Sequence, residues 1–205
     1  MEKGVTPAQL VLAWVLARRQ FRGRILLDTL VSLPLVMPPV ATGLLLLMLF
    51  APRGPVGAVL ARAGIEVVFT RKAVVLAMAI MALPLFVRTA RAGFEQVERR
   101  YESVAATLGA PPWRVFLTVS LPLAAPSLIA ATVLGFARSI GEFGATIVIA
   151  GSIPGSTRTL AVAIYSFAET GNDREAALLL AVSAAIAFAA LWISTALAPG
   201  SGVRR

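Results

Sequence analysis

The sequence predicts an all-α integral membrane protein, and three observations support this fold class. Hydrophobic residues make up 58% of the 205 residues and charged residues only 14%, whereas a soluble domain of this size carries about 25% charged residues. Four apolar runs are long enough, at about 20 residues each, to cross the roughly 30 Å hydrocarbon core as helices. No segment has the composition of a soluble domain, so residues 1–205 are predicted to form a single transmembrane domain.

The four predicted full spans follow one another along the chain. They cover approximately residues 25–50, 73–90, 121–140 and 176–198. The last two are rich in small residues, which let helices pack closely in lipid. A fifth apolar run at residues 7–17 is predicted to be a truncated first helix, because its length as a helix would be only about 16 Å. Its basic cluster follows the apolar stretch instead of preceding it, which argues against a signal peptide.

The basic residues predict which loops face the cytoplasm. The chain has 19 Lys and Arg against 10 Asp and Glu, a net charge of +9. In an apolar chain this excess marks cytoplasmic loops and is not a sign of nucleic-acid binding. Eleven of the 19 lie in residues 18–24, 88–114 and the C-terminus, against six in the opposite loops. These three segments are therefore predicted to be cytoplasmic.

The composition also excludes several kinds of chemistry. The chain contains no histidine and no cysteine, which removes Ser-His catalysis and the usual zinc sites. Its two lysines, Lys3 and Lys72, do not follow a glycine, so the GxxxxGK[ST] phosphate-binding loop is absent. We therefore expect no enzymatic activity, no metal and no cofactor bound by this chain; if ATP drives it, another polypeptide binds the ATP.

The cytoplasmic loop at residues 94–120 is predicted to form a helix, a turn and a second short helix. Apolar residues recur in steps of three and four over residues 94–108, which traces one helix face. Gly109 follows at the position of a left-handed helix cap, and two prolines then prevent continuation. Residues 113–119 are predicted to form the second helix. From these residues alone, the loop is either an amphipathic connector lying on lipid or a handle that another protein binds.

Three prolines interrupt the first full apolar run. Pro34, Pro38 and Pro39 each remove a helical hydrogen bond and free a carbonyl. Two interpretations remain open, because such a kink can serve helix packing or can place irregular backbone along a water-lined path.

A second group of residues near the end of the third full run is a candidate gate or translocation path. Arg138 and Glu142 are four residues apart, so they are expected to share a helix face and pair. Charges within a span are functional candidates by default, although the pair can equally hold structure together without touching an anion. Ser139 offers a hydroxyl to an anion, and Gly141 and Gly144 allow close approach or a helix break.

The loop carries a resemblance to a known family. Residues 103–126, SVAATLGAPPWRVFLTVSLPLAAP, resemble the EAA loop of permease subunits in bacterial ABC importers. Gly109 matches the motif's glycine and Ala105 its second alanine, whereas Ser103 stands at the motif's glutamate and Glu102 lies one position earlier. The resemblance implies that a cytoplasmic ATPase is coupled through Glu102, Ser103, Ala105, Leu108, Gly109 and Ala110.

Three further segments extend the resemblance over residues 20–197. They are LVSLPLVMPPVATG (residues 30–43), ARSIGEFGATIVIAGSIPG (residues 137–155) and TRTLAVAIY (residues 157–165), and they resemble molybdate ABC transporter permeases. The GEFGA run restricts the resemblance to the molybdate, tungstate and sulfate group, and IPG before TRTL favours molybdate. Such permeases have a complete first span where this chain has eleven apolar residues.

The resemblance implies a pore-forming, multi-pass subunit of the bacterial inner membrane that imports molybdate or tungstate. It implies a homodimer in membrane lipid, two cytoplasmic ABC ATPase subunits that bind ATP and Mg, and an extracytoplasmic oxyanion-binding protein. No nucleic-acid partner is expected. Two alternatives remain: a permease for sulfate or thiosulfate, or a non-transporting membrane remnant that lacks the first span.

Overall fold

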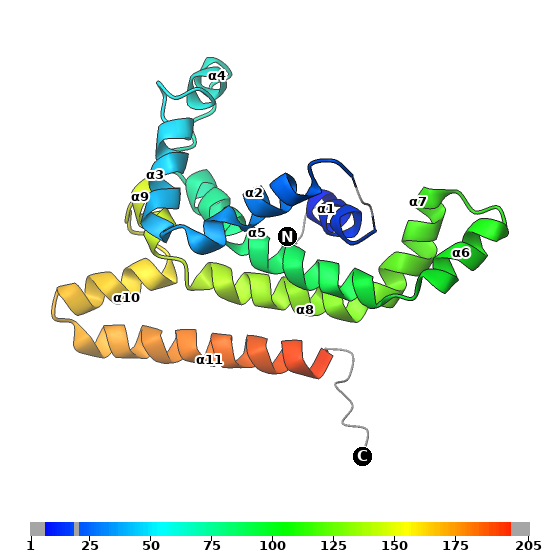
Figure 1. Ribbon diagram of the computed structural model, residues 1–205. Helices are drawn as coiled ribbons and strands as arrows, with labels where there is room; N and C mark the ends of the chain where they lie inside the picture. The colour runs from blue at the N-terminus through cyan, green and yellow to red at the C-terminus, as the bar shows by residue number, and fades with distance from the viewer. Residues whose placement is uncertain (1–6, 19–20, 198–205) are drawn as a thin grey trace. The chain divides into compact units, whose positions relative to one another are not determined.

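The computed structural model describes residues 7–18 and 21–197, and all regular structure in these two ranges is helical (Figure 1). The basic residues Lys3, Arg19, Arg204 and Arg205, and Ala198 at the end of the last predicted span, lie outside the described residues. The helices are α1 (Pro7–Arg18), α2 (Arg24–Val36), α3 (Pro39–Phe50), α4 (Gly57–Arg62), α5 (Arg71–Gln96), α6 (Arg99–Thr107), α7 (Pro112–Val115), the π-helical turn η1 (Phe116–Ser120), α8 (Leu121–Ile140), α9 (Gly144–Ala150), α10 (Leu160–Glu169) and α11 (Asp173–Leu197).

The chain divides into two compact units, and the divisions fall within helices α2, α5, α8 and α11. Unit 1 consists of Met1–Leu30, Leu85–Gly135 and Ala189–Arg205. Unit 2 consists of Val31–Pro84 and Phe136–Phe188. Each unit holds one group of candidate functional residues: the loop around Gly109 belongs to unit 1, and the Arg138–Glu142 pair belongs to unit 2.

Three helical stretches are long and apolar enough to cross a membrane. They are Arg71–Gln96, Pro112–Ile140 and Asp173–Ala196. They contain the runs predicted at residues 73–90 and 121–140, and residues 176–196 of the run predicted at 176–198. Helix α5 continues past residue 90 to Gln96, so the loop that was predicted to begin at residue 94 begins after residue 96. Helix α1 is short, as predicted, with 12 residues.

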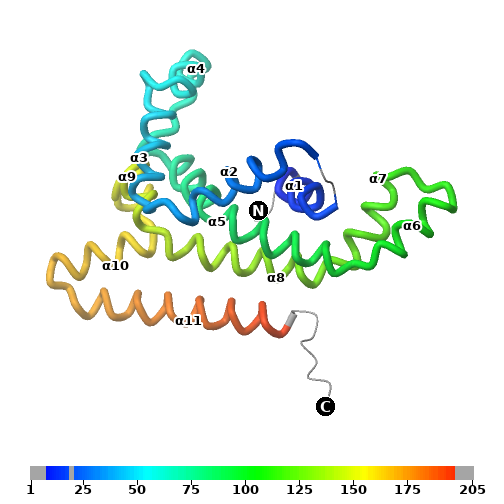
Figure 2. The backbone as a smooth tube through the Cα atoms, in the orientation of Figure 1, coloured from blue at the N-terminus to red at the C-terminus, as the bar shows by residue number. Residues whose placement is uncertain are grey.

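The run predicted as one span at residues 25–50 forms two helices instead. The chain bends by 114° between helices α2 and α3, at a short break at Met37–Pro38 (Figure 2). Two consecutive prolines explain why the run forms two separate helices and not one kinked helix. Neither Pro38 nor Pro39 can donate a backbone hydrogen bond, and each disfavours helical backbone in the residue before it. Pro34, in contrast, is accommodated inside α2.

The second short helix predicted at residues 113–119 is not separate from the following span. Helix α7 passes through η1 directly into α8, which gives one stretch of 29 residues. The π-helical turn accommodates Pro122, whose ring would clash with a carbonyl four residues earlier in a regular α-helix. In this turn the backbone N–H of Leu121 donates to the carbonyl of Phe116, five residues earlier.

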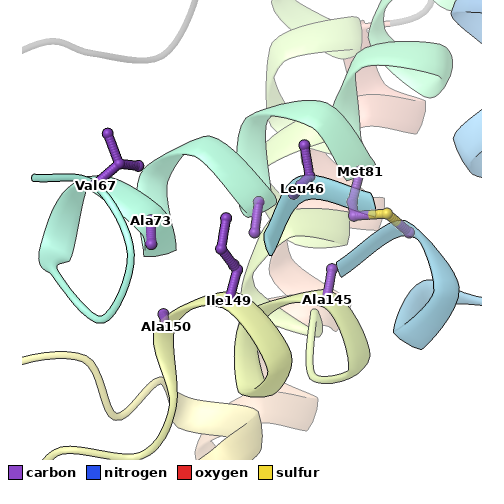
Figure 3. Packing of buried hydrophobic residues seen from close by; sticks show 8 residues of the cluster. Leu46, Val67, Ala73, Met81, Ala145, Ile149 and Ala150 are labelled. Carbon is purple, nitrogen blue, oxygen red and sulfur yellow. The ribbon is translucent and has the colours of Figure 1, made fainter. Parts of the chain in front are cut away.

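The core of unit 2 forms where helices α3, α5 and α9 meet (Figure 3). Small residues set the separation of α3 and α9, because a Cβ atom on Gly43 would lie only 2.8 Å from the backbone Cα and O atoms of Ala145. A Cβ on Gly144 would likewise lie 2.8 Å from the Cβ of Pro39. The break before α3 is therefore in direct contact with the start of α9. The core residues are Leu46, Val67, Ala73, Ala77, Met81, Ala145, Ile149 and Ala150.

We expect Gly43→Ala to destabilise the protein, because the added methyl group would meet backbone that cannot rotate away. Overpacking of this kind costs about 1–3 kcal/mol, which thermal unfolding of the purified protein in detergent would register as a lower midpoint. Gly141→Ala is the matched control, since the atom nearest to its added methyl group would be the Arg138 carbonyl oxygen at 3.9 Å. Equal midpoints for the two variants would contradict the close contact between α3 and α9.

Candidate functional site

The turn after helix α6 has the geometry predicted from its glycine. Gly109 adopts a φ angle of +85°, in the left-handed region. The N–H of Ala110 donates to the carbonyl of Ala105 at 3.1 Å, and the N–H of Gly109 donates to the carbonyl of Ala106 at 3.0 Å. This pair of bonds is the Schellman motif, which satisfies the last carbonyls of a helix. The turn therefore fixes the direction in which the chain leaves α6.

The apolar face predicted over residues 94–108 does not lie on one helix. The backbone breaks at Val97–Glu98, between α5 and α6. Phe94 and Val97, before or at the break, are buried inside unit 1, whereas α6 has no buried residue. Steps of three and four continue across the break, so periodicity alone could not locate it.

Helix α6 and the turn present apolar side chains to their surroundings. Tyr101, Val104 and Trp113 are each more than half exposed, and Leu108 is 83% exposed. Ser103, at the position of the motif's glutamate, is exposed and donates its hydroxyl to the carbonyl of Arg99. Exposed apolar residues on such a helix fit both alternatives, a helix that lies on lipid and a surface that another protein covers.

Glu102 differs from its neighbours because its carboxylate is held within unit 1. Its Oε1 atom accepts hydrogen bonds from the Arg18 guanidinium at 3.1 Å and from the Ser120 hydroxyl at 2.7 Å. A second nitrogen of Arg18 donates to the carbonyl of Val97 at 2.6 Å. Only 8% of the Arg18 side chain and 19% of the Glu102 side chain are exposed.

These partners of Glu102 could not be found from the sequence. Arg18 lies 84 residues from Glu102. In the sequence it is one of several basic residues that are predicted to be cytoplasmic. A pocket of about 400 Å³ adjoins the group and is lined by residues of α1, α6 and α7 and by Ser120 of η1. Trp14 lines this pocket, and its ring makes an edge-to-face contact with Phe116, with 5.3 Å between ring centroids.

In unit 2, Arg138 and Glu142 form the ion pair expected from their spacing, although they do not share a helix. Arg138 lies in the last turn of α8, and Glu142 lies in the turn that follows. The guanidinium Nη1 donates to Glu142 Oε2 at 3.0 Å. The other carboxylate oxygen, Oε1, accepts the backbone N–H of Ala145 at 2.8 Å and so caps the first turn of α9.

Burial of this pair is uneven. The Glu142 side chain is 2% exposed, whereas one third of the Arg138 side chain is exposed. A buried carboxylate requires partners, and here it has two, a guanidinium and a helix N-terminus. The exposed part of Arg138 leaves donors that could reach a small anion, because a guanidinium has five N–H groups.

The remaining predicted path residues divide into two groups. Pro39 and Gly144 are brought together, as described above, at the start of α9. Gly141 makes no close approach, but it directly follows the end of α8 at Ile140, where the helix breaks. Ser139 donates its hydroxyl to the carbonyl of Met78 at 3.5 Å. Pro34 lies inside α2, and Pro38 lies in the break, at the N-cap position of α3. Thr42, in the first turn of α3, was not predicted; its hydroxyl is buried without a hydrogen-bond partner in the described part of the chain.

No group of three or more His, Cys, Asp or Glu side chains that could hold a metal ion occurs within residues 7–18 and 21–197. Apart from the Thr42 hydroxyl, the polar groups described above pair with each other or with backbone. The chemistry that they support is pairing, capping and contact with a small anion.

Comparison with known proteins identifies close relatives over almost the whole chain. A family model described as "Binding-protein-dependent transport system inner membrane component" matches residues 9–200. The molybdenum transport system permease protein ModB of Escherichia coli is 47% identical over 194 residues, which cover 94% of this chain and 85% of that protein. The sulfate transport system permease protein CysT of Escherichia coli is 42% identical over 156 residues, or 76% of this chain and 56% of that protein.

A solved structure with the same fold is more distant in sequence. It is a bacterial alginate ABC transporter in complex with an alginate pentasaccharide-bound periplasmic protein, with a TM-score of 0.63 and 18% sequence identity. The match covers 93% of this chain and 69% of that chain. At this identity the likeness concerns the fold alone.

Proposed function

Since the chain belongs to the family of inner membrane components of binding-protein-dependent transport systems, we propose that it is the permease subunit of an ATP-driven importer of molybdate or tungstate. The observation that carries the substrate class is the 47% identity to a molybdenum permease over 94% of the chain. The subunit forms the pore and performs no covalent chemistry.

The proposed complex contains two copies of this chain, two cytoplasmic ATPase subunits that bind ATP and Mg, and an extracytoplasmic oxyanion-binding protein. Helix α6 and the Gly109 turn provide the surface on which the ATPase docks. The exposed side chains of Tyr101, Val104 and Leu108 support this role, because such residues gain from being covered. The Schellman turn makes the docking surface rigid.

In this proposal, movement of the ATPase reaches the gate along the chain itself. Helix α7 follows the turn directly and continues through η1 and α8 to Ile140. The ion-paired turn at Glu142 comes next, and it caps α9. The helical chain thus runs without a loop from the docking surface to the residues that end α8, and this is the route we propose for the displacement.

A permease for sulfate or thiosulfate is the second candidate, and the 42% identity to a sulfate permease favours it. Tetrahedral dianions have similar size and charge, so a pore for one resembles a pore for another. Measurement of which anion is transported distinguishes the two candidates.

We expect proteoliposomes that contain the full complex to accumulate radiolabelled molybdate only when ATP and the binding protein are both present. Unlabelled tungstate should compete at concentrations similar to molybdate, whereas about a hundredfold excess of sulfate, a difference of about 2.7 kcal/mol in binding, should not. A complex with a catalytically inactive ATPase is the control. Equal accumulation of labelled sulfate would support the second candidate in place of the first.

A further inference from the structure

We propose that Arg18 is a positioning residue that fixes the orientation of helix α6 through Glu102. This inference rests on the proposed function, because the orientation matters only if α6 receives the motion of an ATPase. The group consisting of Arg18, Glu102, Ser120 and the Val97 carbonyl is called the Arg18 bridge below.

The Arg18 bridge joins three elements at a single carboxylate oxygen. Glu102 Oε1, on α6, accepts from Arg18 at the end of α1 and from Ser120 at the end of η1. Ser120 is fully buried, and it directly precedes α8. Glu102 is thus tied both to α1 and to the start of a membrane-spanning helix.

Helix α6 needs such a connection because it has little packing of its own. None of its nine residues is buried, and irregular backbone flanks it at Val97–Glu98 and at the Gly109 turn. The capped Gly109 turn fixes α6 relative to α7, so the angle of α6 can vary chiefly at the break between it and α5. The hydrogen bonds to Glu102 are therefore the main restraint on its angle.

The guanidinium is suited to this position. Arg18 contacts the carbonyl of Val97, on one side of the break, and the carboxylate of Glu102, on the other. A planar group with several fixed donors can hold two acceptors at a set separation, which the single ammonium of lysine does less well. Arg18 thereby sets the angle between α5 and α6.

Aromatic contacts hold the other side of the bridge independently of the ion pair. Trp14 of α1 packs against Phe116 of η1, and Phe116 lies 6.1 Å from Phe94 of α5, centroid to centroid. Removal of the charge on Glu102 should therefore release α6 while α1 stays in place.

In this geometry Glu102 binds other residues of its own chain. The docking surface is formed by its exposed neighbours on α6. Four fifths of the Glu102 side chain is covered within this chain, so little of it can contact an ATPase. Its position, one residue before the family's motif glutamate, is explained by this internal role.

The first test uses the purified permease without its ATPase. Because the chain contains no cysteine, Thr107→Cys provides a single site on exposed α6 for a nitroxide label. In Glu102→Gln and in Arg18→Ala, the mobile fraction of the electron paramagnetic resonance spectrum should rise at least about twofold, since the restraint on α6 is lost. Ser120→Ala, which removes one hydrogen bond and no charge, should give a smaller rise.

Glu95→Gln is the matched control. It removes a carboxylate from the same unit, in an exposed pair with Arg91 at 2.8 Å, and should leave the spectrum unchanged because exposed pairs add little restraint. Spectra of Glu102→Gln and Arg18→Ala that match the unsubstituted, labelled protein would overturn the proposal, whatever the transport activity.

The second test uses the full complex in proteoliposomes and compares ATP hydrolysis with molybdate uptake. Glu102→Gln and Arg18→Ala should hydrolyse ATP but take up about tenfold less molybdate per ATP, a loss equivalent to about 1.4 kcal/mol. Arg18→Lys should recover part of this ratio because it keeps the charge. An unchanged ratio in variants with a mobile α6 would overturn the proposal. Absence of uptake by the unsubstituted complex would instead refute the proposed function, and the label would still report on the bridge.

Discussion

Arg138→Ala is expected to abolish most transport while the protein remains in the membrane. The substitution leaves Glu142, 2% exposed, with the Ala145 N–H as its only remaining hydrogen-bond donor of those described above. Removal of one partner from a buried pair costs about 3–5 kcal/mol. The unpaired negative charge then disfavours its own burial and repels an arriving dianion. Uptake of radiolabelled molybdate at matched expression measures the effect.

A double variant separates the two roles considered for Arg138. Glu142→Gln removes the charge but keeps an oxygen that can accept the Ala145 N–H, so the cap on α9 survives. If the pair is structural, Arg138→Ala with Glu142→Gln should recover much of the uptake. If Arg138 contacts the anion, the double variant should stay as inactive as the single. Arg62→Ala, which removes an exposed arginine from α4, is the control, and normal uptake by Arg138→Ala would rule out both roles.

Gly109→Val is expected to uncouple transport from ATP hydrolysis. No atom would lie within 4 Å of a Cβ added at this position, so the effect comes from the backbone and involves no clash. A left-handed conformation costs an ordinary residue about 1–2 kcal/mol, and a β-branched residue is a stronger outlier. The bond from Ala110 to Ala105 should break and the turn should open.

Comparison with Gly109→Asn tests this explanation. Asparagine tolerates the left-handed region, so this variant should retain most of the uptake per ATP that Gly109→Val loses. Both variants should reach the membrane and bind the ATPase at normal levels. Normal transport by an assembled Gly109→Val complex would show that the turn does not couple the two subunits.

The sequence predicted those features that depend on local chemistry. Apolar runs marked the spans at residues 73–90, 121–140 and 176–198, and Gly109 marked its turn, because length, hydropathy and backbone freedom act within a few residues. The size of the break at Pro38–Pro39 was underestimated. A proline in the sequence shows that a helical hydrogen bond is missing. The angle between the two helices depends instead on what the second helix packs against, which here is α9.

Features that depend on distant residues were not predicted. The Arg18 bridge joins side chains 84 residues apart, and nothing in the residues around Arg18 indicates its partner. Glu142 was placed on the helix of Arg138 because a spacing of four fits a helix. The chain instead turns after Ile140, and the same spacing brings the two side chains together across the turn. The capping role of Glu142 depends on where α9 begins.

The ion pair between Arg18 and Glu102 also restricts the number of times that the chain between these two residues can cross the membrane. Since the two side chains bond directly, the end of α1 and the α6 loop lie on the same side of the bilayer. If helix α5, which is long and apolar enough to span the membrane, crosses once between them, the chain between residues 18 and 71 must cross an odd number of times. In that interval the bent pair α2–α3 is the only described segment long enough to do so. A broken span satisfies this requirement, whereas a re-entrant loop would place Arg18 and Glu102 on opposite faces of the bilayer.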